Sequence, residues 1–130
     1  PKKFTYRGEN INPPLIISNI PLETKSIALI VDDPDAPSGD WVHWIVFDMP
    51  LLSKIEENSV PGKQGMNDFG RIGYDGPFPP FGIHRYFFKV YALDTKLDLI
   101  EGARKSDLEK AMENHVLAKA ELTGLYKKGD

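Results

Sequence analysis

The chain has 130 residues, of which 41% are hydrophobic and 27% are charged, as is ordinary for one folded domain. Its net charge is −3 and its Lys and Arg residues are scattered, which argues against a nucleic-acid-binding protein with a basic face. It contains no cysteine, so disulfides and thiolate metal sites are excluded, and no apolar run approaches the roughly 18 residues of a membrane span. We expect a single domain over residues 1–130, located in the cytoplasm and without a membrane span.

The first strong strand signal is the continuous apolar run at residues 26–32, which is typical of a buried strand. It ends at residues 33–39, where two prolines and a glycine prevent regular structure. The next strand is predicted over residues 41–48, where strict alternation puts the odd-numbered residues, Trp41 and His43 among them, on one face.

A third strand is predicted over residues 84–93, with His84 and Tyr86 on one face and Arg85 on the other. Short apolar runs separated by many of the 11 prolines and 11 glycines are typical of an all-β sandwich with long connections. Between the second and third strands lies an irregular stretch, residues 50–80, and a loop of this length in a small domain is usually functional.

The C-terminal part changes from a strand pattern to a helix pattern. Ser106 and Glu109 fit a capping box, in which the first caps the helix and the second reaches back from the third helical position. Apolar residues then recur at helical spacing. We predict one helix over residues 107–122, with Gly124 as its stop.

Ionisable residues collect where the predicted strands begin and end. Asp33 and Asp35 follow the first strand, His43 lies near the start of the second, and His84 opens the third. Strand ends beside loops are where a scaffold presents a pocket. A structural role is the alternative for each residue, because aspartates in such turns accept backbone hydrogen bonds. The two histidines and two aspartates are also potential metal ligands, and no nucleophile with an adjacent base is evident.

Three blocks of the sequence resemble the phosphatidylethanolamine-binding proteins, the family that includes the Raf kinase inhibitor proteins and their bacterial and archaeal relatives. The blocks are residues 33–37, 41–44 and 76–86, and they occur in the family's order. The resemblance implies a mainly β fold, a two-sheet antiparallel β-sandwich with a C-terminal α-helix and an anion-binding pocket at one end.

The resemblance also predicts, residue by residue, the ligand-binding positions of this pocket: Asp33, Asp35, Trp41, His43, Gly76, Pro77, His84 and Tyr86. It implies that Arg85 supports the pocket wall, and that a cis peptide before Pro37 aims both aspartates into the site. Asp33 is expected to orient His43 and raise its pKa, so that anion binding weakens as pH rises. Amides near Gly76 would add donors.

We therefore expect a binding protein without catalytic activity, cofactor or bound metal. Its ligand would be a small anion, such as phosphate, a phospholipid headgroup or a phosphorylated side chain. The resemblance also implies a protein partner, a kinase or a serine protease that the protein inhibits, and a homodimer is left open. The alternative is a metal-assisted enzyme that uses the two histidines and two aspartates.

Overall fold

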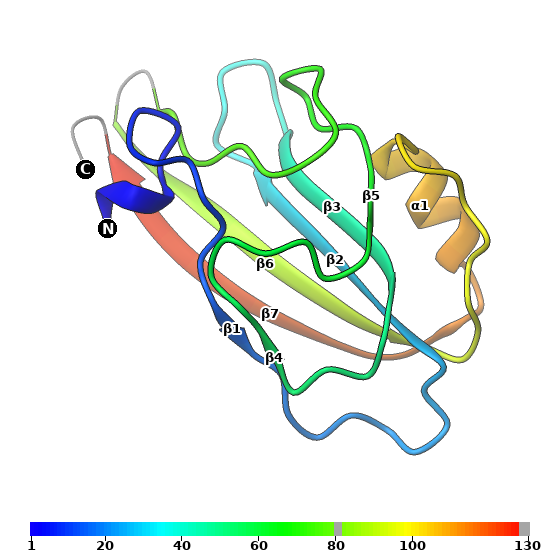
Figure 1. Cartoon of the computed structure of the whole chain (residues 1–130). Coiled ribbons are helices and arrows are strands. Elements are labelled where there is room, and N and C mark those ends of the chain that lie inside the picture. Colours follow the sequence, from blue (N-terminus) through cyan, green and yellow to red (C-terminus); the bar gives the residue numbers. More distant parts are fainter. Residues whose placement is uncertain (80–81, 128–130) are drawn as a thin grey trace.

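The structure, a computed structural model, describes residues 1–79 and 82–127, and its strands form two antiparallel sheets (Figure 1). The larger sheet has five strands in the order β5-β3-β2-β6-β7, and the smaller pairs β1 with β4. The elements in chain order are a 3₁₀ turn (Lys2–Phe4), β1 (Leu15–Ile16), β2 (Ser26–Asp33), β3 (Trp41–Met49), β4 (Lys54–Ile55), β5 (Lys63–Gln64), β6 (Ile83–Leu93), α1 (Lys105–Met112) and β7 (Val116–Lys127). The predicted mainly β fold of two antiparallel sheets is confirmed.

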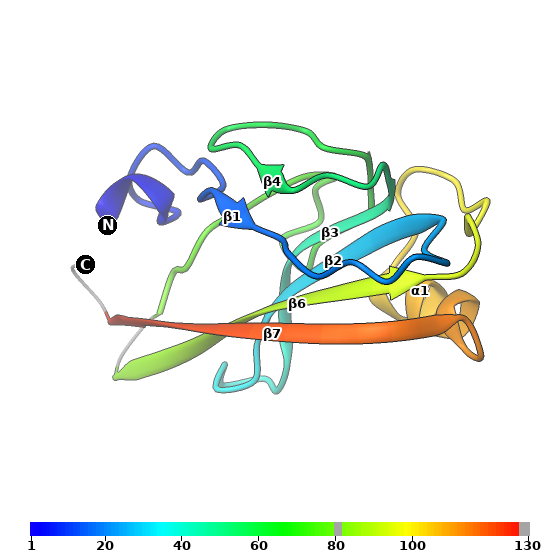
Figure 2. The same ribbon diagram turned by 90° about the horizontal axis from the view of Figure 1, so that it is seen from below.

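The larger sheet is covered on both faces, with the small sheet on one side and α1 on the other (Figures 1 and 2). Strand β2 lies between β3 and β6, and all of its residues are buried. Its side chains alternate: Ile27 and Leu29 face the small sheet, whereas Ala28 and Ile30 face α1. Burial on both faces explains why the sequence of this strand is continuously apolar.

A β-bulge interrupts the pairing of β2 with β3 next to His43. Asp32 pairs with Val42, but the preceding Val31 pairs with Trp44, so β3 carries one extra residue at this point. Such an insertion changes the phase of side-chain alternation along the bulged strand.

The bulge changes the face on which His43 lies. Its ring centroid lies 5.1 Å from that of Tyr86, a residue of the core beneath the small sheet. Ile45 and Phe47 instead pack in the core beneath α1. The prediction that the odd-numbered residues of this strand share one face is therefore wrong, because strict alternation allows for no bulge.

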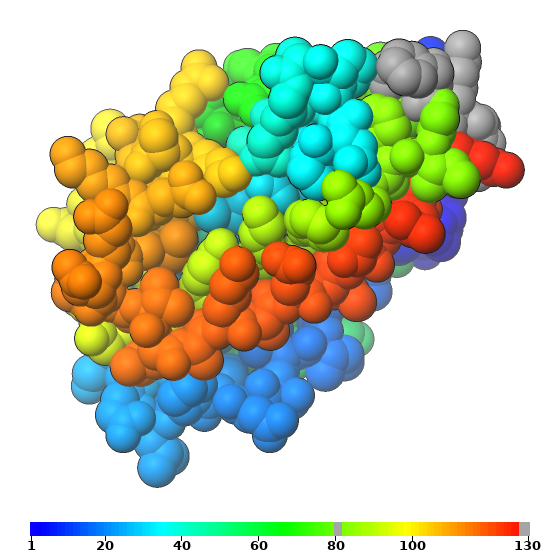
Figure 3. All heavy atoms as spheres, turned by 180° about the vertical axis from the view of Figure 1, so that it is seen from behind, coloured from blue at the N-terminus to red at the C-terminus, as the bar shows by residue number. Residues whose placement is uncertain are grey.

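The predicted helix over residues 107–122 is correct only over residues 107–112. Helix α1 ends at Met112, and Asn114 follows with a positive φ of 66°. Strand β7 then starts at Val116 and pairs along the whole of β6, which leaves it at the edge of the larger sheet (Figure 3, orange to red). Tertiary pairing thus overrides the local helical spacing, and Gly124 lies within the strand rather than stopping a helix.

The predicted helix cap is also wrong. The helix begins at Lys105, two residues earlier than predicted, and the amide of Arg104 donates to the carboxylate of Asp107 at 2.9 Å, in place of a cap by Ser106 and Glu109. The apolar side of α1 still packs against the sheet, through the buried Leu108 and Met112. Within the described part of the chain, no helix has the length and apolar character needed to cross a membrane.

Candidate functional site

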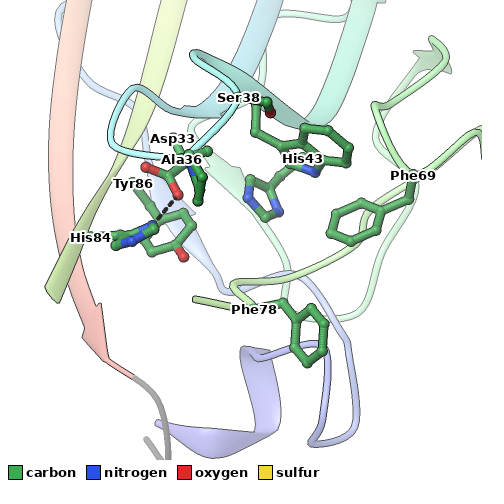
Figure 4. A pocket seen from close by; sticks show the side chains of 10 residues that line it. Asp33, Ala36, Ser38, His43, Phe69, Phe78, His84 and Tyr86 are labelled. Carbon is green, nitrogen blue, oxygen red and sulfur yellow. Dashed lines mark hydrogen bonds and ion pairs between the residues drawn. The ribbon is translucent and has the colours of Figure 1, made fainter. Parts of the chain in front are cut away.

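A cavity of about 310 Å³ lies where the C-terminal end of β2 meets the N-terminal ends of β3 and β6 (Figure 4). Antiparallel pairing brings these three ends together, although they are far apart in the sequence. The cavity is lined by residues of the strand ends and of the neighbouring loops: Asp33, Ala36, Pro37, Ser38, Trp41, His43, Phe69, Phe78, His84 and Tyr86.

Asp33 and His84 form a buried pair at one side of the cavity (Figure 4). The Nδ1 atom of His84 lies 2.7 Å from Oδ2 of Asp33, and the other carboxylate oxygen accepts the amide of Asp35, also at 2.7 Å. A carboxylate without its proton only accepts hydrogen bonds, so Nδ1 of His84 carries the hydrogen. Asp33 thus orients His84, and the prediction that it orients His43 is wrong.

His43 is held from the opposite side by the backbone. Its Nδ1 atom lies 2.7 Å from the carbonyl oxygen of Asp75, which can only accept, so this nitrogen donates. Burial lowers the pKa of His43, and the bond to Asp75 and the charge of Asp33 only partly oppose this. The ring is therefore uncharged at neutral pH with an acceptor at Nε2, which corrects the expected rise of its pKa.

Aromatic side chains form much of the remaining wall. Burial, and next the charge of Asp33, raise the pKa of Tyr86, which keeps its hydroxyl protonated. The ring of Phe69 lies 5.5 Å from those of Trp41 and His43. Phe69 was missed by the sequence-based prediction, because nothing in the irregular stretch distinguishes it from its neighbours.

Three further lining residues, unlike Pro37, had no predicted role in the site. Phe78 belongs to the third block of resemblance, and Ala36 and Ser38 lie in or beside the first, so their positions in these blocks were the available signal. All three come from loops that connect the strand ends. The cavity therefore has a more apolar mouth than the ionisable residues alone suggest.

Asp35 lies outside the cavity, contrary to the prediction. Its carboxylate accepts hydrogen bonds from the amide, Nε and Nη2 of Arg85 at 2.8 to 2.9 Å. These bonds, the side-chain bonds most of all, hold the pKa of Asp35 well below its usual range. The predicted cis peptide before Pro37 is also wrong, since the described residues contain none.

The positions of the two histidines and two aspartates test the alternative of a metal-assisted enzyme. The cavity brings together Asp33, His43 and His84, while Asp35 is turned away toward its arginine. Among the described residues, no group of three or more histidine, aspartate and glutamate side chains is arranged to hold a metal ion. The four residues proposed for a metal-assisted enzyme are thus not assembled at one point.

Gly76 and Pro77 anchor the N-terminal segment rather than line the cavity. The amide of Gly76 donates to Oδ1 of Asn10 at 2.7 Å, and the carbonyl of Pro77 accepts the amide of Tyr6 at 3.0 Å. A Cβ atom on Gly76 would lie 1.9 Å from the carbonyl oxygen of Phe4, so only glycine fits. The Gly76 amide expected to meet a ligand is therefore already used.

Asp75 supports the loop that holds His43. Its buried carboxylate accepts hydrogen bonds from Asn10 and Asn67, both at 2.8 Å, and forms an ion pair with Arg71. Burial alone would raise the pKa of Asp75, but these bonds outweigh it and hold the pKa below its ordinary value. The fixed carboxylate keeps its own backbone carbonyl in place for His43.

The chain is similar to known proteins over nearly its whole length. The family model described as phosphatidylethanolamine-binding protein matches residues 1–127. A UPF0098 protein from Methanothermobacter thermautotrophicus is 53% identical over 137 residues, an alignment that covers 99% of this chain and 91% of that protein.

Two solved structures have the same fold. One is a putative phosphatidylethanolamine-binding protein homolog from Chlamydia trachomatis, with a TM-score of 0.94, 46% identity and coverage of 98% of this chain and 88% of that one. The other is YbcL from E. coli, a member of the mammalian family, with a TM-score of 0.85, 34% identity and coverage of 92% and 82%. The chain therefore belongs to the phosphatidylethanolamine-binding protein family.

Proposed function

We propose that the cavity binds the anionic group of a small ligand, such as a phosphate monoester, and that the protein acts by binding rather than by catalysis. The observation that carries this proposal is the buried pair of His84 with Asp33 beside His43, in a cavity otherwise lined by aromatic and small side chains. The description of the family as phosphatidylethanolamine-binding supports a ligand that bears phosphate.

The carboxylate in the cavity does not conflict with an anionic ligand. Both oxygens of Asp33 already accept hydrogen bonds, one from His84 and one from the amide of Asp35. Its charge is thus directed at protein donors, which reduces repulsion of a second anion. Nδ1 of each histidine already donates within the protein, so the donors that phosphate oxygens would meet are the Nε2–H of a protonated imidazole and the hydroxyl of Tyr86.

The size and lining of the cavity limit the ligand. A volume of about 310 Å³ is at the lower end of the range for ligand pockets, roughly 300–1,000 Å³. This suits a phosphorylated headgroup or a phosphorylated side chain, with the aromatic rings against its apolar atoms. Inhibition of a kinase or a serine protease stays a prediction, since no described contact points to either partner.

Calorimetric titration with sulfate and with phosphoethanolamine tests the proposal. The variants are His84→Gln and His43→Gln, and the matched control is His115→Gln, which removes an exposed histidine whose Nδ1 lies 2.7 Å from Asp94, far along the chain from the cavity residues. Loss of one hydrogen bond to a charged group predicts binding weaker by about 10- to 100-fold in each cavity variant. The control should bind as the wild type does.

Three results would contradict the proposal. Affinity unchanged in the cavity variants, or reduced as much in His115→Gln, would show that the cavity is not the anion site. Release of inorganic phosphate from phosphoethanolamine, followed by phosphorus NMR and abolished in His84→Gln, would show that the site is catalytic.

A further inference from the structure

Strand β7 is a long edge strand that the rest of the described chain leaves uncovered. It pairs with β6 on one side and ends the five-stranded sheet on the other. Residues Val116 to Thr123 are all exposed, and the strand runs across the surface in Figures 2 and 3. The opposite edge of the sheet, β5, is only two residues long.

This edge lacks most of the features that protect natural edge strands. Short length, proline, bulges and inward-pointing charges prevent such strands from pairing with another chain. Strand β7 spans 12 residues without a proline, and its register with β6 is regular from Lys127 to Ala118. Within the described residues, no strand lies beside the outward N–H and C=O groups from Val116 to Thr123, so this part of the edge is arranged to accept another strand.

The two faces of β7 differ in character. One face carries Ala118, Ala120 and Leu122, which border two apolar grooves of about 370 and 460 Å³ beside the β1 segment. The side chains of Lys119 and Glu121 alternate with these, and Nζ of the lysine lies 4.0 Å from Oε1 of the glutamate; both residues also border the grooves. Leu122 is 58% exposed, so a large apolar side chain lies next to these grooves and is largely uncovered by the described residues.

We propose that β7 pairs antiparallel with β7 of a second copy, about a two-fold axis at Ala120. Such an axis, perpendicular to the sheet, maps each face of the sheet onto itself, so each residue meets a residue of the same face. Lys119 then lies opposite the partner's Glu121, and Glu121 opposite the partner's Lys119. Together with the pair of Lys119 and Glu121 within each chain, the four side chains form a cluster in which positive and negative charges alternate.

The same register suits the apolar face. Leu122 lies opposite the partner's Ala118, where its side chain extends over the partner's groove, and Ala120 meets its own copy. A large residue against a small one lets the side chains interdigitate. The two neighbouring symmetric registers are worse, because an axis at Lys119 or at Glu121 places like charges directly opposite each other.

Charge exchange tests the proposal by sedimentation equilibrium of the whole chain over a series of concentrations. The wild type should reach twice its mass of 14.6 kDa. Lys119→Glu and Glu121→Lys should each weaken dimerisation by about tenfold or more, since each places like charges opposite at two positions. Lys54→Glu, an exposed lysine on β4, is the matched control and should dimerise as the wild type does.

Mixing the two charge variants gives the sharpest result. In the mixed pair, glutamates at 119 and 121 of one chain face lysines at 121 and 119 of the other, so a dimer should form in the mixture although neither variant forms one alone. Circular dichroism of each variant verifies its fold. A wild type that stays monomeric, or a mixture that stays monomeric, would overturn the second copy as the occupant of this edge.

Discussion

Replacement of His43 by glutamine should flatten the fall in stability on the acid side of neutrality. The ring is buried, and burial lowers its pKa in the folded state. In the unfolded chain it titrates near the ordinary value of about 6.5. As pH falls below this value the unfolded state binds the proton first, so the free energy of unfolding decreases. Above it, both states are uncharged and the contribution is constant.

The magnitude follows from proton linkage. One proton bound only by the unfolded state lowers the free energy of unfolding by up to about 1.4 kcal/mol for each pH unit, until the lowered folded-state pKa is reached. This is a measurable share of a total stability of about 5–15 kcal/mol. Glutamine does not titrate but keeps an N–H donor for the carbonyl of Asp75, so the slope with pH reports the histidine separately from the lost packing.

Urea unfolding from about pH 5 to about pH 8, without phosphate or sulfate, measures this slope. Anions are omitted because a bound anion would favour the protonated ring. His115→Gln is the control, since its histidine is exposed and should leave the buried contribution in place. Equal slopes for the wild type and His43→Gln would refute the reasoning and show that His43 titrates alike in both states.

Three other substitutions test the limit of the cavity, the close backbone contact at Gly76 and the packing of α1. Asp35→Ala should change sulfate affinity less than threefold, about 0.6 kcal/mol or less, because its carboxylate lies outside the cavity; a calorimetric loss matching that of His84→Gln would contradict this. Gly76→Ala should lower the free energy of unfolding by about 3 kcal/mol or more through a backbone clash, against about 1 kcal/mol for Gly39→Ala, which has open space but a φ of 102°. Leu108→Ala should cost about 3 kcal/mol and Leu22→Ala, at an exposed position, less than about 0.5 kcal/mol, in urea unfolding; equal costs would refute the packing of α1.

Local patterns predicted the three long strands β2, β3 and β6, because their runs of apolar and aromatic residues match their burial within the sheet. The same patterns failed for β7, whose residues also fit helical spacing. Its strand conformation comes from pairing with β6, a contact that no local window contains. Capping signals failed for a related reason, since where α1 begins depends on how its apolar side meets the sheet.

The resemblance located the cavity but did not predict which groups pair. It placed Asp33, His43 and His84 near one another, and all three line the cavity. The choice of His84 as the partner of Asp33 depends on the direction of each side chain at its strand end. The position of Asp35 outside the cavity depends on Arg85, which binds it from the start of the neighbouring strand β6. Such choices require three-dimensional positions rather than spacing along the chain.

The bulge in β3 has a consequence for how this strand tolerates change. Because side-chain alternation shifts at the bulge, Ile45 and Phe47 pack in the core beneath α1, whereas His43 lines the cavity on the other face. The packing of the core residues therefore does not fix the direction of His43. Exchanges among apolar residues at Ile45 or Phe47 can therefore proceed without turning His43 away. Deletion of a single residue at the bulge would restore strict alternation along β3. Either the cavity residues or the core residues of this strand would then point to the wrong face.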